Sequence, residues 1–321
     1  MVPRKSNPQV LADGRTLQYC TIKARLYPDE AQAELFEKTF DCCRYIWNRM
    51  LTDERRFYLE TGAHFIPTPA KYKKEAPFLK EVDNQALTQE YNKLAQAFRV
   101  FFKNPEAFGY PNFKRKKTDR DSFTACSHDF AAGPTIYITR DGLRLTKAGI
   151  VKAKFPRRPR GGWKLRRVTV RKTKSGKYFA SILYEYTVKQ PEPVTPDGDA
   201  ALNVTYSDLT APYWLRRSQE KLAGMYAQLK RMQRGSNRYC ETLRKFRELH
   251  EHVANQRKDF IHKQTSRIAN DWDVVCVTES AEAEAPAGSG MFRECLRYKL
   301  ARRGKTLILA ESSPQTTRAS A

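Results

Sequence analysis

The segment KQPEPVTPDGDAALNVTY, residues 189–206, divides the sequence into two parts of different character. Its first eight residues contain three prolines and predict a linker over 189–196, because proline fixes φ and carries no backbone N–H. The residues that follow predict a strand, in which Leu202 and Val204 share one face and Asn203 takes the other. Asn203 is therefore either an ordinary strand residue or stands where a nuclease would keep a metal-binding carboxylate.

The composition points to a polyanionic partner. The 321 residues include 59 Lys and Arg against 35 Asp and Glu, a formal net charge of +24, which favours nucleic acid. The basic residues spread along the whole chain and no run of about 18 apolar residues occurs, so we expect no membrane partner. The seven cysteines form no C-x-x-C pair and the N-terminus lacks the apolar core of a signal peptide. We expect a cytoplasmic protein that binds no zinc.

The part before the linker combines helical and strand patterns. Residues 18–28 alternate like a strand, and apolar residues at helical spacing from 29 to about 105 predict an all-α module. Apolar runs separated by Gly-containing turns predict a β-module over 120–188, which the strand 18–28 could join.

The part after the linker has the pattern of an α/β domain. A strand at 201–206 is followed by a long helical stretch, 219–270, which is broken at RGSN, residues 234–237. A strand, a helix and a further strand follow within 273–312. Strands that alternate with helices in this way are typical of α/β domains.

Two basic segments each have two interpretations. FGYPNFKRKKTDRDSF, residues 108–123, interleaves Lys and Arg with aromatic residues, which suits phosphate contact and base stacking but also a solvated loop. The helical stretch 219–270 is likewise a solvated coil or a hairpin that faces nucleic acid. The net charge of the chain favours nucleic acid in both cases, with binding that weakens steeply as salt rises.

The acidic residues do not predict a two-metal phosphodiesterase site. Such a site needs carboxylates on one face of adjacent strands, because hard cations prefer anionic oxygen ligands. Strand 201–206 presents Asn203, and strand 274–280 ends in Thr278 and Glu279, which alternate between opposite faces. Further acids lie at strand edges or late in the chain: Asp199, Asp208 and Glu311. The candidate histidine ligands His250, His252 and His262 lack zinc spacing, and we predict no metal site.

Several segments, in collinear order over nearly the whole chain, resemble the TnpB family, transposon-encoded RNA-guided nucleases ancestral to type V CRISPR effectors. The most specific is ANQRKDFIHK, within the fifth of the matching segments. These segments are IKARLYPDEAQAELFEKTFDCCRYIWNRML, FGYPNFKRKK, GLRLTKAGIVKAKF, KLRRVTVRKTKSGKYFASILYE, RGSNRYCETLRKFRELHEHVANQRKDFIHKQTSRIANDWDVV and LRYKLARRGKTLILAESSPQTT.

The resemblance implies an α+β multidomain fold. A β-barrel-like wedge module would comprise 18–28 and 120–188, with a helical recognition module, 29–119, inserted into it, and a truncated RuvC-like α/β domain would occupy 197–321. The resemblance also implies binding of a guide RNA and of a short motif beside the target in double-stranded DNA. Pairing of guide and target then gives an RNA–DNA heteroduplex, held by a monomeric ribonucleoprotein.

The sequence departs from the family at the nuclease acids. A family run like G-I-D-L-G aligns with 201–205, where the Asp has become Asn203. The second acid aligns by gapless count with Thr278, although a slip of one residue would recruit Glu279. The third acid follows a four-cysteine zinc finger in the family, and the sequence ends where that finger would begin, so we expect finger and acid to be absent.

These departures resemble the nuclease-dead TnpB relatives called TldR, RNA-guided transcriptional repressors of bacteria. We therefore expect a nucleoid-associated repressor that acts by occupying DNA and is not an enzyme, with guide RNA as its bound partner and neither zinc nor catalytic Mg²⁺. One alternative is an active TnpB-type endonuclease associated with a transposon, using Asp199 or Asp208 with Glu279 and a late acid. Another is a protein that binds without a guide, or a decayed transposon remnant.

The resemblance also indicates the nucleic-acid contacts. Family segments that match Val82–Thr88 and Ser127–His128 contact the motif beside the target, and the amides of Asn84 and Gln85 suit bidentate pairing with adenine. The expected motif contacts are Asn84, Gln85, Thr88, Ser127 and His128. Contacts to RNA or DNA backbone are expected from Lys114, Arg115, Lys116, Lys117, Arg257, Lys258 and His262.

Overall fold

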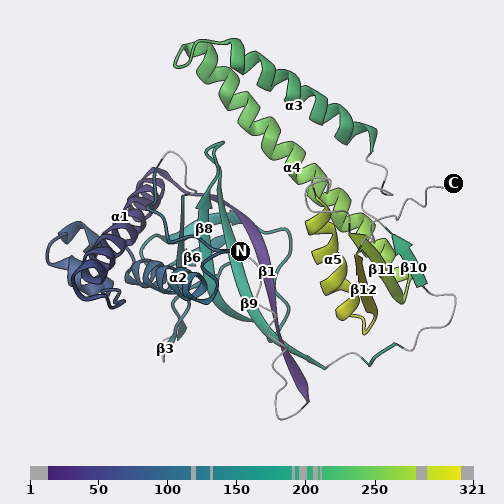
Figure 1. Ribbon diagram of the computed structural model, residues 1–321, viewed down its shortest axis with the longest axis horizontal. Coiled ribbons are helices and arrows are strands. Elements are labelled where there is room, and N and C mark those ends of the chain that lie inside the picture. Colours follow the sequence, from purple (N-terminus) through teal and green to yellow (C-terminus); the bar gives the residue numbers. More distant parts are fainter. Residues whose placement is uncertain are drawn as a thin grey trace, which may run out of the picture. The chain divides into compact units, whose positions relative to one another are not determined.

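The computed structural model describes residues 14–116, 121–130, 133–189, 192–194, 201–204, 209, 212–279 and 288–311. The chain forms two compact units: unit 1, residues 1–188, and unit 2, residues 189–321. Figure 1 shows the helices and strands of both, and each unit is described by itself.

Unit 1 is built on a seven-stranded sheet with the strand order β2-β8-β9-β1-β7-β6-β5. β1 lies between β9 and β7 in the sheet, although both helices of the unit separate β1 from these two strands in the sequence. Ile22, Ala24 and Leu26 of β1 are buried and alternate with polar residues, as a central strand with one core face requires. The strands are β1 (Arg15–Tyr27), β2 (Ser122–Cys126), β5 (Tyr137–Ile138), β6 (Gly142–Leu145), β7 (Gly149–Lys154), β8 (Lys164–Lys172) and β9 (Tyr178–Lys189), and β3 (Asp129–Phe130) pairs with β4 (Gly133–Pro134).

Two helices complete unit 1. α1, Glu30–Thr61, begins with a capping box, in which the Asp29 carboxylate accepts from the backbone N–H of Gln32 at 2.8 Å and the Gln32 side chain accepts from that of Asp29 at 3.2 Å. α2, Asn84–Lys103, begins at Asp83, whose carboxylate accepts from the backbone N–H of the second helical residue. Two short 3₁₀ helices, Pro69–Lys73 and Pro77–Lys80, lie between α1 and α2.

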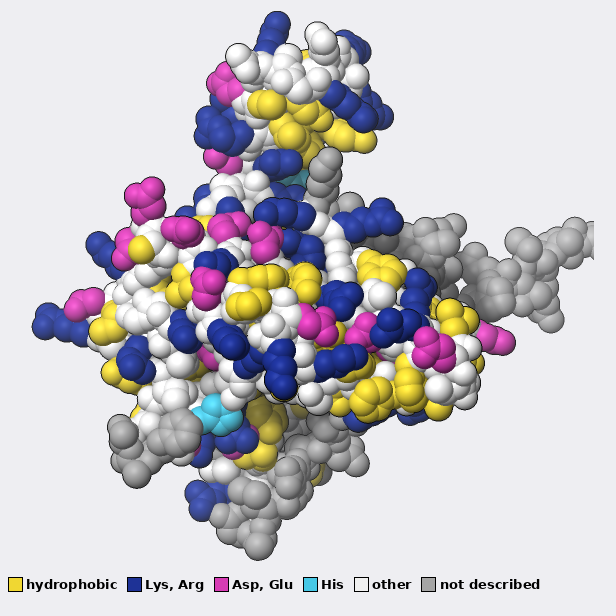
Figure 2. Space-filling model, turned by 90° about the vertical axis from the view of Figure 1, so that its left-hand side faces the viewer, with side chains coloured by type: hydrophobic (Ala, Val, Ile, Leu, Met, Phe, Trp, Pro, Cys, Tyr) yellow, Lys and Arg dark blue, Asp and Glu magenta, His cyan; other side chains and the backbone are white. Residues whose placement is uncertain are grey.

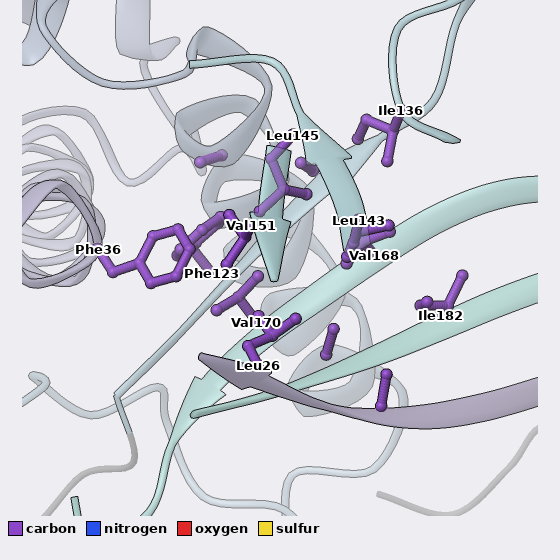
Figure 3. Close-up of a cluster of buried hydrophobic side chains, with 14 of the residues drawn as sticks. Leu26, Phe36, Phe123, Ile136, Leu143, Leu145, Val151, Val168, Val170 and Ile182 are labelled. Carbon is purple, nitrogen blue, oxygen red and sulfur yellow. The ribbon is translucent and has the colours of Figure 1, made fainter. Parts of the chain in front are cut away.

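The core of unit 1 fixes both helices to the sheet. Phe36 of α1 reaches Phe123 of β2, with ring centroids 5.6 Å apart (Figure 3). A second buried cluster holds α1 against α2 and includes Met50, Leu87 and Leu94. Burial of these side chains removes apolar surface from water and leaves little freedom for the helices to shift. The start of α2 is thereby held in a fixed place beside β2.

Unit 2 contains a three-stranded parallel sheet with the order β10-β11-β12. Its elements are β10 (Ala201–Val204), α3 (Tyr213–Arg231), α4 (Asn237–Asp271), β11 (Val274–Glu279), α5 (Ser289–Ala301) and β12 (Thr306–Glu311). Helical connections of this kind are what parallel strands require. α4 and α5 pack on one face of the sheet, where Phe260, Ile261 and Leu296 meet Val275 and Val277.

α3 and α4 form a long helical hairpin whose side chains are largely exposed. The helix break predicted at RGSN is confirmed, because α3 ends at Arg231 and Ser236 caps α4 by accepting from the backbone N–H of Tyr239 at 3.2 Å. Tyr226 and Phe246 contact each other across the hairpin, with ring centroids 6.0 Å apart.

The α+β class predicted from the sequence is confirmed. β2 and β5 stand at the two ends of the strand order in unit 1, so closure into a barrel-like wedge stays a prediction. The RuvC-like architecture of the second unit and the module boundaries also stay predictions. Among the described residues, no helix combines the length and the apolar character that crossing a bilayer requires.

Candidate nucleic-acid interface

The start of α2 and the end of β2 lie close together in unit 1, although they are far apart in the sequence. Asp83, directly before α2, lines a small cavity together with Phe123 and Ala125 of β2, and burial raises the pKa of the Cys126 thiol at the end of that strand. The side chains expected to contact the motif beside the target therefore gather at one edge of the unit, which we call the motif edge. They are Asn84, Gln85 and Thr88 in the first turns of α2, and Ser127 and His128 directly after β2.

The polar groups at this edge are held by local hydrogen bonds. The Asn84 side-chain oxygen accepts from Lys73 Nζ at 2.7 Å, and the Thr88 hydroxyl donates to the Asn84 carbonyl at 3.1 Å. The Ser127 hydroxyl donates to a backbone carbonyl, and the His128 backbone N–H donates to the Thr135 hydroxyl at 3.1 Å. An amide has two donors and an acceptor with two lone pairs, so the side chains of Asn84 and Gln85 can still present hydrogen-bonding groups to a base edge.

Cations border this edge on the neighbouring strand. Arg167 of β8 stands opposite Cys126 in the antiparallel register, and its neighbour Arg166 accepts a backbone hydrogen bond from Ser127 at 3.0 Å. Both arginine residues are exposed. Arg167 and Arg166 were not among the expected contacts, and their place beside the motif edge suits phosphates that flank a base contact.

A second basic surface crosses the outer face of the same sheet, and we call it the sheet row: Lys23, Arg25, Lys154, Arg171 and Phe179. Lys23 Nζ lies 4.1 Å and Arg25 Cζ 5.0 Å from the centre of the Phe179 ring. Arg171 stands opposite Phe179 in register, and Arg25 stands opposite Lys154. In the described part of the chain, no carboxylate forms an ion pair with Arg171 or Lys154. Cations gathered on one face repel each other, and a bound phosphate backbone would reduce that repulsion.

The sheet row was missed in the sequence although strand alternation carries its signal. In VTVRK, Val168 and Val170 face the core while Arg171 falls on the other face. In IKARL the buried residues likewise alternate with Lys23 and Arg25. Basic residues at every second position of a strand whose other face is buried mark a basic sheet face. The order of the strands, which brings these residues together, is not visible in that pattern.

The basic loop after α2 is held in place by side chains of α1 and α2. The backbone of Lys114 pairs in both directions with the Asn48 side chain, donating at 2.8 Å and accepting at 3.0 Å. Lys114 Nζ also forms an ion pair with Glu90, which is fully buried, and lies 4.0 Å from the centre of the Trp47 ring. These contacts give the Lys114 ammonium group an internal partner, so a structural role fits it better than the expected phosphate contact.

The other expected contacts of this loop have different surroundings. Lys116 forms an exposed ion pair with Asp41 at 2.9 Å, which a phosphate could replace at small cost. Arg115 is exposed, and Lys117 lies outside the described residues.

In unit 2 the expected contacts Arg257, Lys258 and His262 lie on α4. Lys258 is exposed and Arg257 is half-buried. His262 packs towards α5 instead: its ring nitrogen lies 3.7 Å from Cys295 Sγ, and burial together with nearby Lys299 lowers the pKa of the ring. A neutral, packed imidazole is a weak phosphate ligand, so the internal contacts favour a structural role for His262.

Lys299 fastens α5 to α4 at the same place. Its side chain is only 7 % exposed, and Nζ donates to the His262 carbonyl and the Thr265 hydroxyl at 2.6 Å and to the Ser266 hydroxyl at 2.8 Å. All three ammonium protons are thus used, which offsets the cost of burying the charge.

The positions expected to correspond to nuclease acids lie on the parallel sheet of unit 2. Asn203 is exposed and stands opposite Cys276 in register. Glu279 stands opposite Glu311 at the ends of β11 and β12, and Thr278 stands opposite Ala310. Asp199 and Asp208 lie outside the described residues.

At position 203 the side chain is an amide rather than a carboxylate. A neutral amide is a weaker ligand for a hard cation than a carboxylate. Where the structure describes side chains, it brings together no group of three or more His, Cys, Asp or Glu that could hold a metal ion. The described interface is therefore one of cations, amides and aromatic rings, a composition suited to binding nucleic acid.

Two family models match parts of the chain. A "Helix-turn-helix domain" model of IS605 OrfB proteins matches residues 20–63, and an IS605 OrfB model described as "Probable transposase" matches residues 200–279.

Two relatives match over most of the chain. A protein of Streptomyces pristinaespiralis named "Putative RNA-guided DNA endonuclease" is 28% identical over 320 residues, covering 90% of this chain and 76% of the relative. A protein of Escherichia coli (strain K12) named "Putative RNA-guided DNA endonuclease InsQ" is 28% identical over 273 residues, covering 80% of this chain. The match spans 65% of the length of that second relative.

A solved structure shares the fold. The cryo-EM structure of a Cas12f1–sgRNA–target DNA complex matches with a TM-score of 0.53 and 12% identity, covering 88% of this chain and 74% of the Cas12f1 chain.

These findings confirm the resemblance to the TnpB family, while the closer likeness to TldR stays a prediction. The expectation that the chain is not an enzyme is contradicted, because both relatives are named as endonucleases, which points to an enzyme. That expectation rested on Asn203, on the alignment of the second acid with Thr278 and on the absence of a third acid. It took no account of the strand register, which sets Glu279 opposite Glu311.

Proposed function

We propose that this TnpB-like chain binds a guide RNA and, through it, double-stranded DNA at sites marked by a short adjacent motif. The chain would act as a monomer in the ribonucleoprotein, on DNA of the bacterial nucleoid. The observation that carries the proposal is the convergence of Asn84, Gln85 and Thr88 with Ser127 and His128 at one edge of unit 1. Two segments that touch one stretch of DNA must lie together in this way.

In this proposal the sheet row and the motif edge have different roles in binding. Cations of the sheet row bind phosphates and position the nucleic acid, whereas the amides of Asn84 and Gln85 read bases. Unit 1 would then correspond to the wedge and recognition modules, and unit 2 to the RuvC-like domain, joined by the linker 189–196. Occupancy of a promoter by such a complex would repress transcription, because a bound ribonucleoprotein blocks RNA polymerase.

Binding to DNA tests the first part of this proposal. The protein is purified with its co-expressed RNA, the RNA is sequenced, and the affinity of the complex is measured for a duplex that matches the guide. We expect the Asn84→Ala/Gln85→Ala variant to bind the duplex with its motif about 10- to 100-fold more weakly, since each bidentate base contact supplies about 1–3 kcal/mol of discrimination. The difference should shrink when the motif is scrambled.

A matched control exists on the same helix. Asn92→Ala/Gln96→Ala removes the same two side-chain types about two to three turns further along α2 and should leave the affinity unchanged. Equal binding of wild-type protein to the duplex with a matched and a scrambled guide would contradict guide-dependent binding. A reporter gene with the target in its promoter tests repression, which should require the matched guide.

A second candidate function is guide-directed cleavage of the bound DNA. The names of the two relatives favour it, and so does the register that sets Glu279 opposite Glu311. The test is incubation of the guide complex with matched target and Mg²⁺, followed by denaturing electrophoresis. Cleavage that is lost in Glu279→Gln and Glu311→Gln but kept in Cys276→Ser would support this candidate, and an intact target at all Mg²⁺ concentrations would exclude it.

A further inference from the structure

Aromatic rings from three separate segments of unit 1 form one connected surface beside α1 and α2, and we call it the aromatic ladder. It consists of Arg55, His64, Phe101, Phe102, Tyr110 and Phe113. The ring of His64 lies 5.0 Å from that of Phe102, Phe102 lies 5.3 Å from Phe101, and Phe101 lies 5.6 Å from Tyr110, centre to centre. The Arg55 guanidinium then bridges Tyr110 at 5.0 Å and Phe113 at 5.2 Å.

A buried carboxylate holds the ladder in place from beneath. Glu54 is 1 % exposed and accepts from Tyr110 and, at 2.8 Å, from the His64 ring. Burial and this hydrogen bond raise the pKa of Tyr110 to about 12, so its hydroxyl stays a donor near neutral pH. His64 at one end of the ladder and Tyr110 further along it are thereby tied to one fixed group, and these rings are arranged before any partner binds.

The outer members of the ladder are open to solvent. Phe102 is 52 % and Phe113 is 41 % exposed. Residues 98–116, which contribute four of the six members, carry five Lys or Arg and one Glu. On the face turned to the viewer in Figure 2, hydrophobic side chains lie between Lys and Arg side chains.

We infer that the aromatic ladder binds the unpaired bases of single-stranded DNA. Bases in a duplex bury their ring faces in the stack, whereas unpaired bases offer them to aromatic and guanidinium groups. The excess of Lys and Arg around the rings suits the phosphates of such a strand. The occupant we assign is the DNA strand displaced when the guide pairs with its target, an assignment that rests on the proposed function.

The test uses the guide complex and a target duplex that carries 2-aminopurine in the displaced strand. Stacking on an aromatic ring quenches 2-aminopurine, so wild-type protein should quench it and Phe102→Ala/Phe113→Ala should not. The variant should also bind the full duplex about 5- to 100-fold more weakly, because stacking supplies about 1–3 kcal/mol per base. Its affinity for the target strand alone, with no displaced strand present, should be unchanged.

Phe78→Ala is the matched control, because Phe78 is 39 % exposed in the same unit but contacts Tyr45 rather than the ladder. It should behave as wild type. Undiminished quenching in the double variant would overturn the inference, and so would equal losses of affinity for both targets. Loss of a wild-type dimer in sedimentation, with DNA binding unchanged, would show that a second copy of the chain occupies the ladder. A wild-type complex that binds neither target would contradict the proposed function as well.

Discussion

Lys114 and Lys116 lie two residues apart in one basic loop, yet their ammonium groups have different surroundings. The partner of Lys114, Glu90, is fully buried, whereas Lys116 and Asp41 are both exposed. Removing one member of a buried pair leaves a charge in a poorly solvating environment, whereas losing an exposed pair changes little. The sequence KRKK does not distinguish the two residues, since only the fold places a buried acid beneath one of them.

We predict that Lys114→Ala lowers the free energy of unfolding by about 2 kcal/mol, less than the full cost of breaking a buried pair because Lys93 still pairs with Glu90. Urea denaturation followed by circular dichroism measures this change. Lys116→Ala should stay within about 0.5 kcal/mol of wild type. Equal effects of the two substitutions would show that the Lys114 contact contributes little to stability.

Asp53 makes the stability of unit 1 depend on pH. Burial alone would raise the pKa of this carboxyl group, but hydrogen bonds from Lys71 Nζ at 2.8 Å and Tyr72 Oη at 2.9 Å outweigh it and hold the pKa below its usual value. A carboxyl group whose pKa is lower in the folded than in the unfolded state stabilises the fold at pH values above the unfolded-state pKa of about 4. This stabilisation is lost as pH falls through the folded-state pKa.

We therefore predict that Asp53→Asn costs about 2 kcal/mol at neutral pH, since hydrogen bonds to a charged group are lost. The difference from wild type should shrink as pH falls below about 4. Urea denaturation at a series of pH values measures it. Glu60→Gln is the control, because Glu60 is exposed, and it should show no such convergence. A difference between Asp53→Asn and wild type that stays constant with pH would contradict the assigned cause.

At the scale of elements, local signals predicted where helices begin and break. The helix start near residue 29 and the RGSN break are both confirmed, because capping and glycine conformation depend on neighbouring residues. The pattern did not show that α1 runs unbroken to Thr61. It also did not show that, of the apolar run TIYIT at residues 135–139 in the predicted β-module, only Tyr137–Ile138 is a strand. Those outcomes depend on packing partners that lie elsewhere in the chain.

The candidate site divides in the same way. Residue types at the motif edge were predicted from the resemblance, but the neighbourhood of α2 and β2 became visible only in the fold. His262 has helical spacing that fits an exposed or a packed face equally well, and only the position of α5 decides between them. The sheet row depends on strand order, which no single strand encodes.

The pairing of β6 with β7 requires a glycine at one position. A Cβ atom on Gly142 would lie 2.2 Å from the Val151 carbonyl oxygen, a backbone atom that cannot move without shifting the strand pair. We predict that Gly142→Ala lowers the free energy of unfolding by about 2–3 kcal/mol, as overpacking does. Gly161→Ala, where a Cβ atom meets nothing within 4 Å, should leave the free energy of unfolding nearly unchanged. Thermal denaturation of both variants measures the difference. A neutral Gly142→Ala would show that the strands separate readily.

At the scale of the whole molecule, the net charge of +24 determines how binding responds to salt. Cations that neutralise phosphates release counterions, so the logarithm of the binding constant falls linearly with the logarithm of salt concentration. Solvated cations scattered over the surface contribute less to this slope than cations held against the backbone. The slope therefore measures whether the sheet row binds nucleic acid or merely faces solvent.

We predict that Arg171→Gln/Lys154→Gln weakens binding of the guide RNA and lowers the salt slope by about 1 to 2, since each lost phosphate contact removes about 0.7–0.9. Filter binding from low to moderate salt measures both quantities. Lys38→Gln/Arg56→Gln removes the same charge from exposed residues that have acidic neighbours, and should leave the slope near wild type. If both double variants lowered the salt slope equally, binding would depend on the total charge of the chain rather than on the sheet row. A selective effect of the Arg171 and Lys154 changes would instead locate RNA phosphates on the outer face of the sheet.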